Sequence, residues 1–150
     1  MSTNNRMRVS IAGLAAAATL GSGLALAPSS QAATSIKDKA YSTGKAQIGD
    51  PYRYGATGPN AFDCSGLIYY SYKKNGKTLP RVAQSQYNRS TKISAKNRKV
   101  GDLVFFGSPS NIYHVGFYAG NGKVLHAPKP GRTVKYEKIW TSQVRYGRFN

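Results

Sequence analysis

The residues of this sequence with the clearest capacity for chemistry are one cysteine and two histidines. Cys64 is the only cysteine among 150 residues, and His114 and His126 are the only histidines. A lone cysteine cannot form an internal disulfide, so Cys64 is a buried inert thiol, an intermolecular linker or a reactive group. Because a thiolate is a nucleophile and a neutral imidazole accepts its proton, the three residues together have the chemistry of nucleophilic catalysis.

The residues around Cys64 predict that it opens a helix. Asp63 is a good N-cap residue, and the apolar run from Leu67 to Tyr72 follows before a stop at Gly76. Unpaired backbone N–H groups and the helix macrodipole favour an anion in the first turn. We therefore expect Cys64 to be a thiolate of lowered pKa at a helix N-terminus.

The two histidines lie on a predicted β-hairpin whose turn decides whether they can cooperate. The turn signal is Gly120-Asn121-Gly122. A two-residue turn would place His126 opposite Phe117, on the other face of the hairpin from His114. A three-residue loop with a bulge would place His126 opposite Gly116, on the face of His114. Cooperation of the two histidines therefore predicts the bulged form.

If the histidines share a face, a mechanism follows. His114 would act as the general base that draws the proton from Cys64 and later gives it to a leaving amine. His126 would hold the other ring nitrogen of His114 and fix its tautomer. A three-ligand zinc site made of the same residues is the alternative, although nothing in their spacing is typical of zinc ligands. We expect no metal and no cofactor.

Other polar residues are candidates for binding a substrate. Backbone N–H groups at the start of the cysteine helix, with a hydroxyl from Tyr52 or Tyr54, would form an oxyanion hole. Asp63 would cap the helix, bind a substrate ammonium, or do both. Arg81 is either a ligand for a substrate carboxylate or an ordinary surface charge, and the spacing does not separate the two.

The order of the predicted elements is helices first and an antiparallel sheet second, which is typical of the α+β class. The cysteine helix would pack on that sheet. We expect further helices at Ser35–Ile48 and Val82–Asn88, a loop at Ser90–Arg98, and strands at Asp102–Phe106, Ile112–Ala119, Lys123–Ala127, Thr133–Lys138 and Val144–Phe149.

The N-terminal segment has the pattern of a signal peptide. Arg6 and Arg8 precede an apolar, alanine-rich stretch from Ile11 to Ala27, and small residues suited to cleavage end at Ala32 or Ala33. The stretch is too short and too weakly apolar to favour a membrane anchor. We expect residues 1–33 to be removed on export and residues 34–150 to form one domain.

The charge of the exported part is strongly positive. Residues 34–150 contain twenty of the twenty-two Lys and Arg and all five acidic residues, which makes their formal net charge +15. An excess of this size favours an anionic partner, such as a cell-wall polymer. The basic residues are scattered and match no nucleic-acid motif, so we do not expect a nucleic-acid partner. We expect a secreted monomer without a membrane anchor.

The chain resembles the NlpC/P60 family of papain-like cysteine peptidases from bacterial cell walls, from about Ala40 to the C-terminus. The matching segments are Gly49-Asp50-Pro51-Tyr52-Arg53-Tyr54-Gly55, Phe62-Asp63-Cys64-Ser65-Gly66-Leu67, Leu79-Pro80-Arg81 with Gln86, Gly101-Asp102-Leu103-Val104-Phe105-Phe106, His114-Val115-Gly116-Phe117-Tyr118, Gly120-Asn121-Gly122 and His126-Ala127-Pro128. One departure is Ala56-Thr57 after Gly55, where the family often has a second glycine. No SH3-like or LysM wall-binding module is recognisable, and the positive charge would replace it.

The resemblance implies an exported enzyme that cuts peptidoglycan stem peptides, usually between γ-D-glutamate and the diamino acid. It implies Cys64 as nucleophile, His114 as base and His126 as the third polar residue. It also implies Tyr52 near the oxyanion, and Asp63 and Ser65 placed to receive a free N-terminal amine. Two alternatives stay open: an amidase or acyltransferase of the same fold, and a non-enzymatic cationic wall-binding protein.

Overall fold

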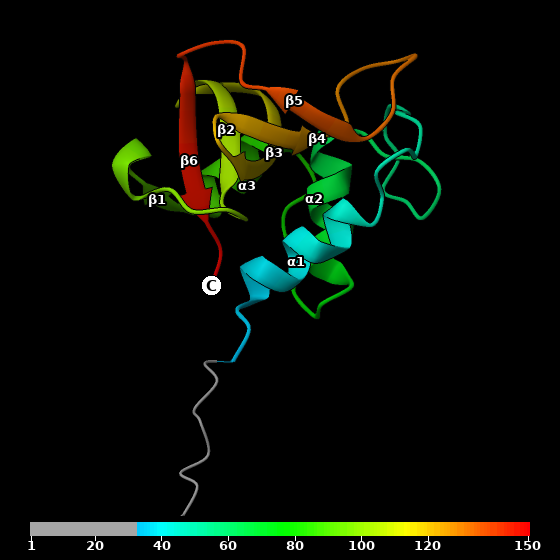
Figure 1. Ribbon diagram of the computed structural model, residues 1–150, viewed down its shortest axis with the longest axis horizontal. Helices are drawn as coiled ribbons and strands as arrows, with labels where there is room; N and C mark the ends of the chain where they lie inside the picture. The colour runs from blue at the N-terminus through cyan, green and yellow to red at the C-terminus, as the bar shows by residue number, and fades with distance from the viewer. Residues whose placement is uncertain (1–32) are drawn as a thin grey trace, which may run out of the picture. The chain divides into compact units, whose positions relative to one another are not determined.

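The structure is a computed structural model that describes residues 33–150 of the chain. The expected signal peptide, apart from Ala33, lies outside the described residues. Within them the chain forms α-helices and one six-stranded antiparallel sheet, as expected of the α+β class (Figure 1). No helix in residues 33–150 is long and apolar enough to cross a bilayer.

Three α-helices precede the six strands of the sheet in the chain. They are α1 (Ile36–Lys45), α2 (Cys64–Lys73) and α3 (Ala83–Arg89). The side chain of Ser35 caps α1 by accepting a hydrogen bond from the Asp38 backbone N–H. The helix α1 ends before the predicted Ile48, because the chain turns from Ala46 onward. The helix α2 begins at Cys64, as predicted.

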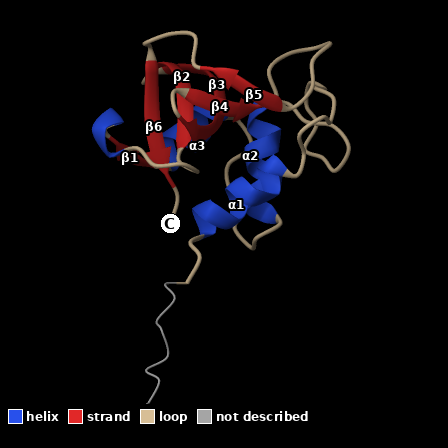
Figure 2. Ribbon diagram, viewed as in Figure 1, coloured by secondary structure: helices blue, strands red, loops and turns tan. Residues whose placement is uncertain are grey.

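The sheet has the strand order β1-β6-β2-β3-β4-β5. Its strands are β1 (Thr91–Ile93), β2 (Leu103–Ser108), β3 (Asn111–Gly120), β4 (Lys123–His126), β5 (Lys135–Lys138) and β6 (Val144–Arg148). The prediction of an irregular loop at Ser90–Arg98 is wrong, since the segment contains β1 and a short 3-10 helix, Ala95–Asn97. Figure 2 shows α1 and α2 close together beside the strands, and the short 3-10 helix at the other end of the sheet, next to β1.

Alternation along β2 divides its side chains between two apolar clusters. Leu103 and Phe105 belong to the larger cluster, which also contains Leu67 and Ile68 of α2. Val104 and Phe106 belong to a smaller cluster. Fully burying one such side chain contributes about 1.5–3 kcal/mol. The larger cluster therefore holds α2, and with it Cys64, firmly against the sheet.

The hairpin between β3 and β4 has the register that brings the histidines together, by a route that differs from the expected one. The turn has two residues, Asn121 and Gly122, both with positive φ, and Gly120 pairs with Lys123. The extra residue lies in the strand: the register shifts between Tyr118 and Gly120, so the bulge is at Ala119. The prediction of a bulged hairpin is confirmed, whereas the prediction of a three-residue loop is wrong.

Candidate active site

The first turn of α2 is built by close backbone contacts. Asp63 caps the helix, and its Oδ1 accepts a hydrogen bond from the Gly66 N–H at 2.7 Å. A Cβ on residue 66 would lie 2.0 Å from the carbonyl oxygen of Ala56, so only glycine fits there. The buried Gln86 donates its amide N–H to the Ser65 carbonyl at 3.1 Å. Cys64 is thus held in a turn that is fixed on both sides.

Asp63 is also the centre of a charged cluster beside Cys64. Arg81 donates from Nη1 to Oδ1 at 3.1 Å and from Nη2 to Oδ2 at 2.8 Å, and Nη1 also donates to the Ser65 hydroxyl at 2.9 Å. The Gly55 N–H donates to Oδ2 at 2.8 Å. The structure therefore brings together Asp63, Ser65 and Arg81, three residues singled out in the sequence.

The two histidine rings are in direct contact. The Nε2 atom of His114 lies 2.7 Å from Nδ1 of His126, and the two rings are nearly perpendicular, at 79°. A Cβ on Gly116 would lie 3.0 Å from Cβ of His126 and 2.4 Å from a methyl of Val124, so the missing side chain at Gly116 leaves room for this approach. The histidines share a face of the hairpin, as the bulged register requires.

Sequence reasoning missed Glu137, which extends this pair. Its Oε2 lies 2.7 Å from Nε2 of His126. In the sheet His126 pairs with Lys135, so Glu137, two residues further along β5, lies diagonally opposite His126 on the same face. Its signal in the sequence was slight: it is the only glutamate, and it lies on a predicted strand.

Aromatic rings cover the histidine pair. Trp140 stacks on Phe106 with ring centroids 4.2 Å apart and planes 7° apart. The Trp140 ring lies 5.8 Å from that of His114 and 5.6 Å from that of His126. The two imidazoles are consequently 7% and 1% exposed.

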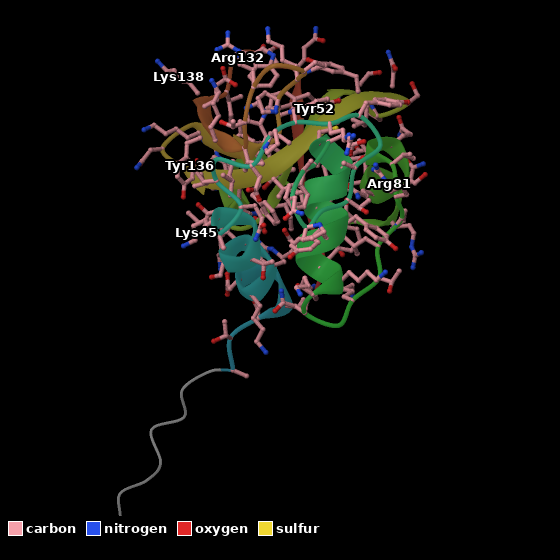
Figure 3. All side chains as sticks on the ribbon, turned by 90° about the vertical axis from the view of Figure 1, so that its right-hand side faces the viewer. Lys45, Tyr52, Arg81, Arg132, Tyr136 and Lys138 are labelled. Atoms are coloured by element: carbon pink, nitrogen blue, oxygen red, sulfur yellow. The ribbon has the colours of Figure 1, made fainter. Side chains whose placement is uncertain are left out.

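Two cavities meet at Cys64. One, of about 380 Å³, is lined by Cys64, His114 and His126, with Trp140 and Lys129 at its wall. The other, of about 500 Å³, is lined by Cys64, Asp63, Ser65 and Arg81 with Tyr54 and Tyr113. Tyr52 lines both, and Figure 3 shows Tyr52 and Arg81 near the helix α2. The cysteine thus lies where a histidine-lined space joins an arginine-lined one.

Burial determines the charge state of the cysteine and the histidines. Burial raises the pKa of the Cys64 thiol, and the Asp63 carboxylate raises it further. Hydrogen bonding from the backbone of Val115 and Ser65 opposes this rise in pKa without cancelling it. The expectation of a thiolate with lowered pKa is therefore wrong for the unliganded protein, because desolvation outweighs the local effect of the helix N-terminus.

Burial also lowers the pKa of His114 to about 3, with a further contribution from His126. The pKa of His126 is lowered by burial too, although its hydrogen bond to Glu137 works in the opposite direction. At neutral pH both rings are uncharged, and the thiol keeps its proton. The involvement of Val115, the neighbour of His114, shows that the Cys64 sulfur lies close to β3 at this point.

Tyr52 and Tyr54, the two candidate oxyanion donors, differ in their surroundings. Burial and the neighbouring Cys64 raise the pKa of Tyr52, so its hydroxyl remains a hydrogen-bond donor at neutral pH. Tyr54 is exposed and lines the arginine-side cavity. Among residues 33–150 no group of three or more His, Cys, Asp or Glu is found in an arrangement that could hold a metal ion.

An α+β fold in which a helix-borne cysteine and a pair of hydrogen-bonded histidines face one cavity has the architecture of a thiol hydrolase. The family model described as "NlpC/P60 family" matches residues 49–147. The chain belongs to the NlpC/P60 family.

Relatives of known sequence agree with this membership. A probable endopeptidase p60 from Listeria innocua is 47% identical over 92 residues, which cover 61% of this chain and 19% of the relative. The bifunctional muramidase/DL-endopeptidase CwlT of Bacillus subtilis is 47% identical over 95 residues, which cover 61% of this chain and 28% of CwlT. The matched part of the chain therefore spans less than a third of the length of either of these two relatives.

Solved structures give the same fold. The NlpC/p60 domain of the peptidoglycan hydrolase SagA superposes with a TM-score of 0.70 at 35% identity, covering 75% of this chain and 98% of that one. RipD of Mycobacterium tuberculosis, described as a non-catalytic NlpC/p60 domain protein adapted to peptidoglycan binding, superposes with a TM-score of 0.65 at 28% identity, covering 77% and 98%. The family thus includes catalytic and non-catalytic domains. Membership alone therefore does not establish catalysis, and the residues of the site are needed to argue for it.

Proposed function

We propose that this protein is a cysteine endopeptidase that hydrolyses the stem peptides of peptidoglycan. The observation that carries the proposal is the cavity where Cys64 meets His114 and His126. The names of the relatives support it, since p60 is named a probable endopeptidase, CwlT a DL-endopeptidase and SagA a peptidoglycan hydrolase.

The reaction begins with proton transfer. Because Nε2 of His114 is engaged by His126, its Nδ1 is the nitrogen left to act as base. His114 Nδ1 takes the proton of the Cys64 thiol, directly or through one water, as the sulfur attacks the carbonyl carbon of the scissile amide. Because the Cys64 thiol is protonated before the substrate is attacked, the proton transfer to His114 occurs during the attack.

The tetrahedral intermediate then breaks down. Its oxyanion lies at the start of α2, where backbone N–H groups and the Tyr52 hydroxyl are the donors. The protonated His114 gives its proton to the leaving nitrogen as the C–N bond breaks, which leaves a thioester on Cys64. Water, deprotonated by His114, attacks the thioester and releases a carboxylic acid, and the thiol is restored.

The bond we propose joins γ-D-glutamate to the diamino acid in the third position. The name DL-endopeptidase carried by CwlT supports a bond between residues of opposite chirality. A γ-glutamyl residue keeps a free α-carboxylate near the scissile carbonyl. Arg81, placed in the second cavity beside Ser65, is the cation available to such a carboxylate.

Digestion of purified muropeptides tests this proposal. Wild-type protein is expected to release products whose masses match cleavage after γ-D-glutamate, and Cys64→Ala is expected to release none. Ser110→Ala, a change in the turn between β2 and β3, serves as the matched control and should leave the products unchanged. Masses that match a different acyl bond would indicate the amidase or acyltransferase. Identical profiles from wild type and Cys64→Ala would leave a peptidoglycan-binding role of the kind described for RipD.

We further propose that the protein is exported through removal of residues 1–33 and acts in the wall as a monomer. The positive charge of the remaining residues would hold it on anionic wall polymers. Exposed cations such as Lys45, Arg132 and Lys138 lie on its surface (Figure 3).

A further inference from the structure

Glu137 lines the cavity that contains Cys64, and its carboxylate stands at one end of a hydrogen-bonded series that includes both histidines. Glu137 contacts His126, His126 contacts His114, and His114 lines the cavity with Cys64. We infer that Glu137 is a positioning residue that fixes the tautomer of His114 through His126. The inference rests on the proposed function for its effect on rate, while its effect on the tautomer can be measured without any substrate.

The protonation pattern follows from the hydrogen-bond partners. A carboxylate only accepts hydrogen bonds, so the Nε2 of His126 that lies 2.7 Å from Glu137 must carry a hydrogen. In neutral His126 the other nitrogen, Nδ1, is then an acceptor. The Nε2 of His114 must therefore donate to it, which leaves Nδ1 of His114 with a free lone pair.

Without the carboxylate the same two rings can adopt the opposite arrangement. His126 would carry its hydrogen on Nδ1 and donate to Nε2 of His114. His114 would then carry its own hydrogen on Nδ1, the nitrogen that has to accept the thiol proton. Both arrangements keep the contact between the rings, so the ring contact alone does not select the productive one. The selection comes from Glu137.

The two oxygens of Glu137 have different partners. Oε2 holds the buried His126, whereas Oε1 lies 3.7 Å from Nζ of Lys135 on the outer surface. The side chain of Glu137 is 41% exposed and that of His126 only 1%. An exposed pair such as Lys135–Glu137 contributes little to stability. A glutamine at this position can still hydrogen-bond to His126, so the charge of Glu137 can be removed with little effect on folding. Lys135, the other partner of the same carboxylate, offers a control.

The decisive variant is Glu137→Gln, compared with Lys135→Ala. A glutamine has the same shape, but its amide can either accept from or donate to Nε2 of His126, so it no longer selects a tautomer. The first measurement is the ¹⁵N chemical shifts of protein labelled in its two histidines. We expect Nδ1 of His114 to be unprotonated in wild type and in Lys135→Ala, and to become partly protonated in Glu137→Gln.

The second measurement is the rate of muropeptide cleavage. We expect kcat of Glu137→Gln to fall by about 10- to 100-fold while KM changes by less than about twofold, since a wrong tautomer removes the base and not the binding site. Lys135→Ala should retain kcat within about twofold. Thermal unfolding of all three proteins confirms that they are folded.

The outcomes separate cleanly. Unchanged nitrogen shifts in Glu137→Gln, or a loss of activity expressed in KM alone, would overturn the inference. If wild type cleaves no muropeptide, the proposed function fails, and the nitrogen shifts alone then support or overturn the role of Glu137.

Discussion

The two terminal nitrogens of Arg81 donate hydrogen bonds to the two carboxylate oxygens of Asp63, at 3.1 and 2.8 Å. The same two oxygens also accept the N–H groups of Gly66 and Gly55, at 2.7 and 2.8 Å. A carboxylate has about four sites for hydrogen-bond donors, so those of Asp63 are filled. A substrate ammonium could bind Asp63 only by displacing Arg81.

This arrangement predicts how the enzyme treats the N-terminus of a stem peptide. Although the family resemblance implies that Asp63 and Ser65 receive a free amine, we expect wild-type protein to cleave peptides with an acylated N-terminus at least as fast as peptides with a free one. Arg81→Met uncovers the carboxylate of Asp63 and should shift the preference toward the free amine. The measurement is the ratio of kcat/KM for the two peptides, with the exposed Arg53→Met as control. A wild-type preference for the free amine of tenfold or more would contradict this prediction.

The raised pKa of Cys64 predicts slow alkylation near neutral pH. A thiolate reacts with iodoacetamide, and burial together with the Asp63 charge disfavours the thiolate. We expect the rate of labelling to increase with pH, with a midpoint above about 8.5, the usual pKa of a cysteine thiol. Mass spectrometry of protein labelled at a series of pH values gives the titration, with a free cysteine peptide as the reference. Faster labelling of Cys64 than of the peptide at pH 6 would show a thiolate–imidazolium pair instead.

The lowered pKa values of the histidines predict a loss of stability in acid. The pKa of His114 is about 3 in the folded protein, and it returns to about 6.5 when the chain unfolds. Between these values the unfolded state binds more protons, so the free energy of unfolding falls as the pH falls. The expected slope is about 1.4 kcal/mol per pH unit for His114, and it disappears above pH 6.5.

Urea unfolding of wild type and His114→Gln at pH 7, 6, 5 and 4 measures this effect. The acidic residues titrate in both proteins, so the difference between the slopes belongs to His114. Equal slopes between pH 6 and pH 4 would show that burial does not depress the pKa of His114 in solution.

The distribution of charge predicts that wall binding depends on salt. Four of the five acidic residues have a basic partner: Asp38 with Lys37, Asp63 with Arg81, Asp102 with Arg148, and Glu137 with Lys135 and His126. Few acids are therefore left to balance the surplus of lysine and arginine at the surface. We expect inactive Cys64→Ala to sediment with purified walls at about 0.01 M salt and to be released at about 1 M, as the Debye length falls from about 30 Å to about 3 Å.

Walls stripped of their anionic polymers provide the control for this experiment and should bind less protein at low salt. Equal binding at both salt concentrations would mean that contacts other than charge hold the protein on the wall.

Local patterns in the sequence were sufficient to predict the elements that carry the cysteine and the histidines. Asp63 followed by an apolar run is a helix start, and strand periodicity around a glycine-rich turn is a hairpin. The strand β1 escaped prediction because it has only three residues, of which Thr91 and Lys92 are polar and exposed, and pairing with β6 makes them a strand. Glu137 escaped because its contact with His126 depends on how β4 pairs with β5, which no local pattern specifies.

The charge state of Cys64 was mispredicted for a related reason. The effect of a helix N-terminus can be inferred from neighbouring residues, whereas burial depends on the whole core. The larger cluster, against which the partly buried Cys64 packs, shields the thiol from much of the water, and this desolvation is the largest influence on its pKa. A sequence motif therefore identifies the candidate reactive atoms better than it predicts whether those atoms carry a proton in the resting protein.

Because of the bulge at Ala119, the number of residues between the two histidines decides whether their side chains lie on the same face of the hairpin. Successive side chains of a strand point to opposite faces of the sheet. Deletion of Ala119 would therefore turn the side chain of His126 to the other face from His114, although both histidines would still be present in the sequence. Insertions or deletions of two residues between them would preserve the contact, whereas a change of one would abolish it. The contact between the two imidazoles therefore depends on the number of residues that separate them as well as on the presence of both histidines.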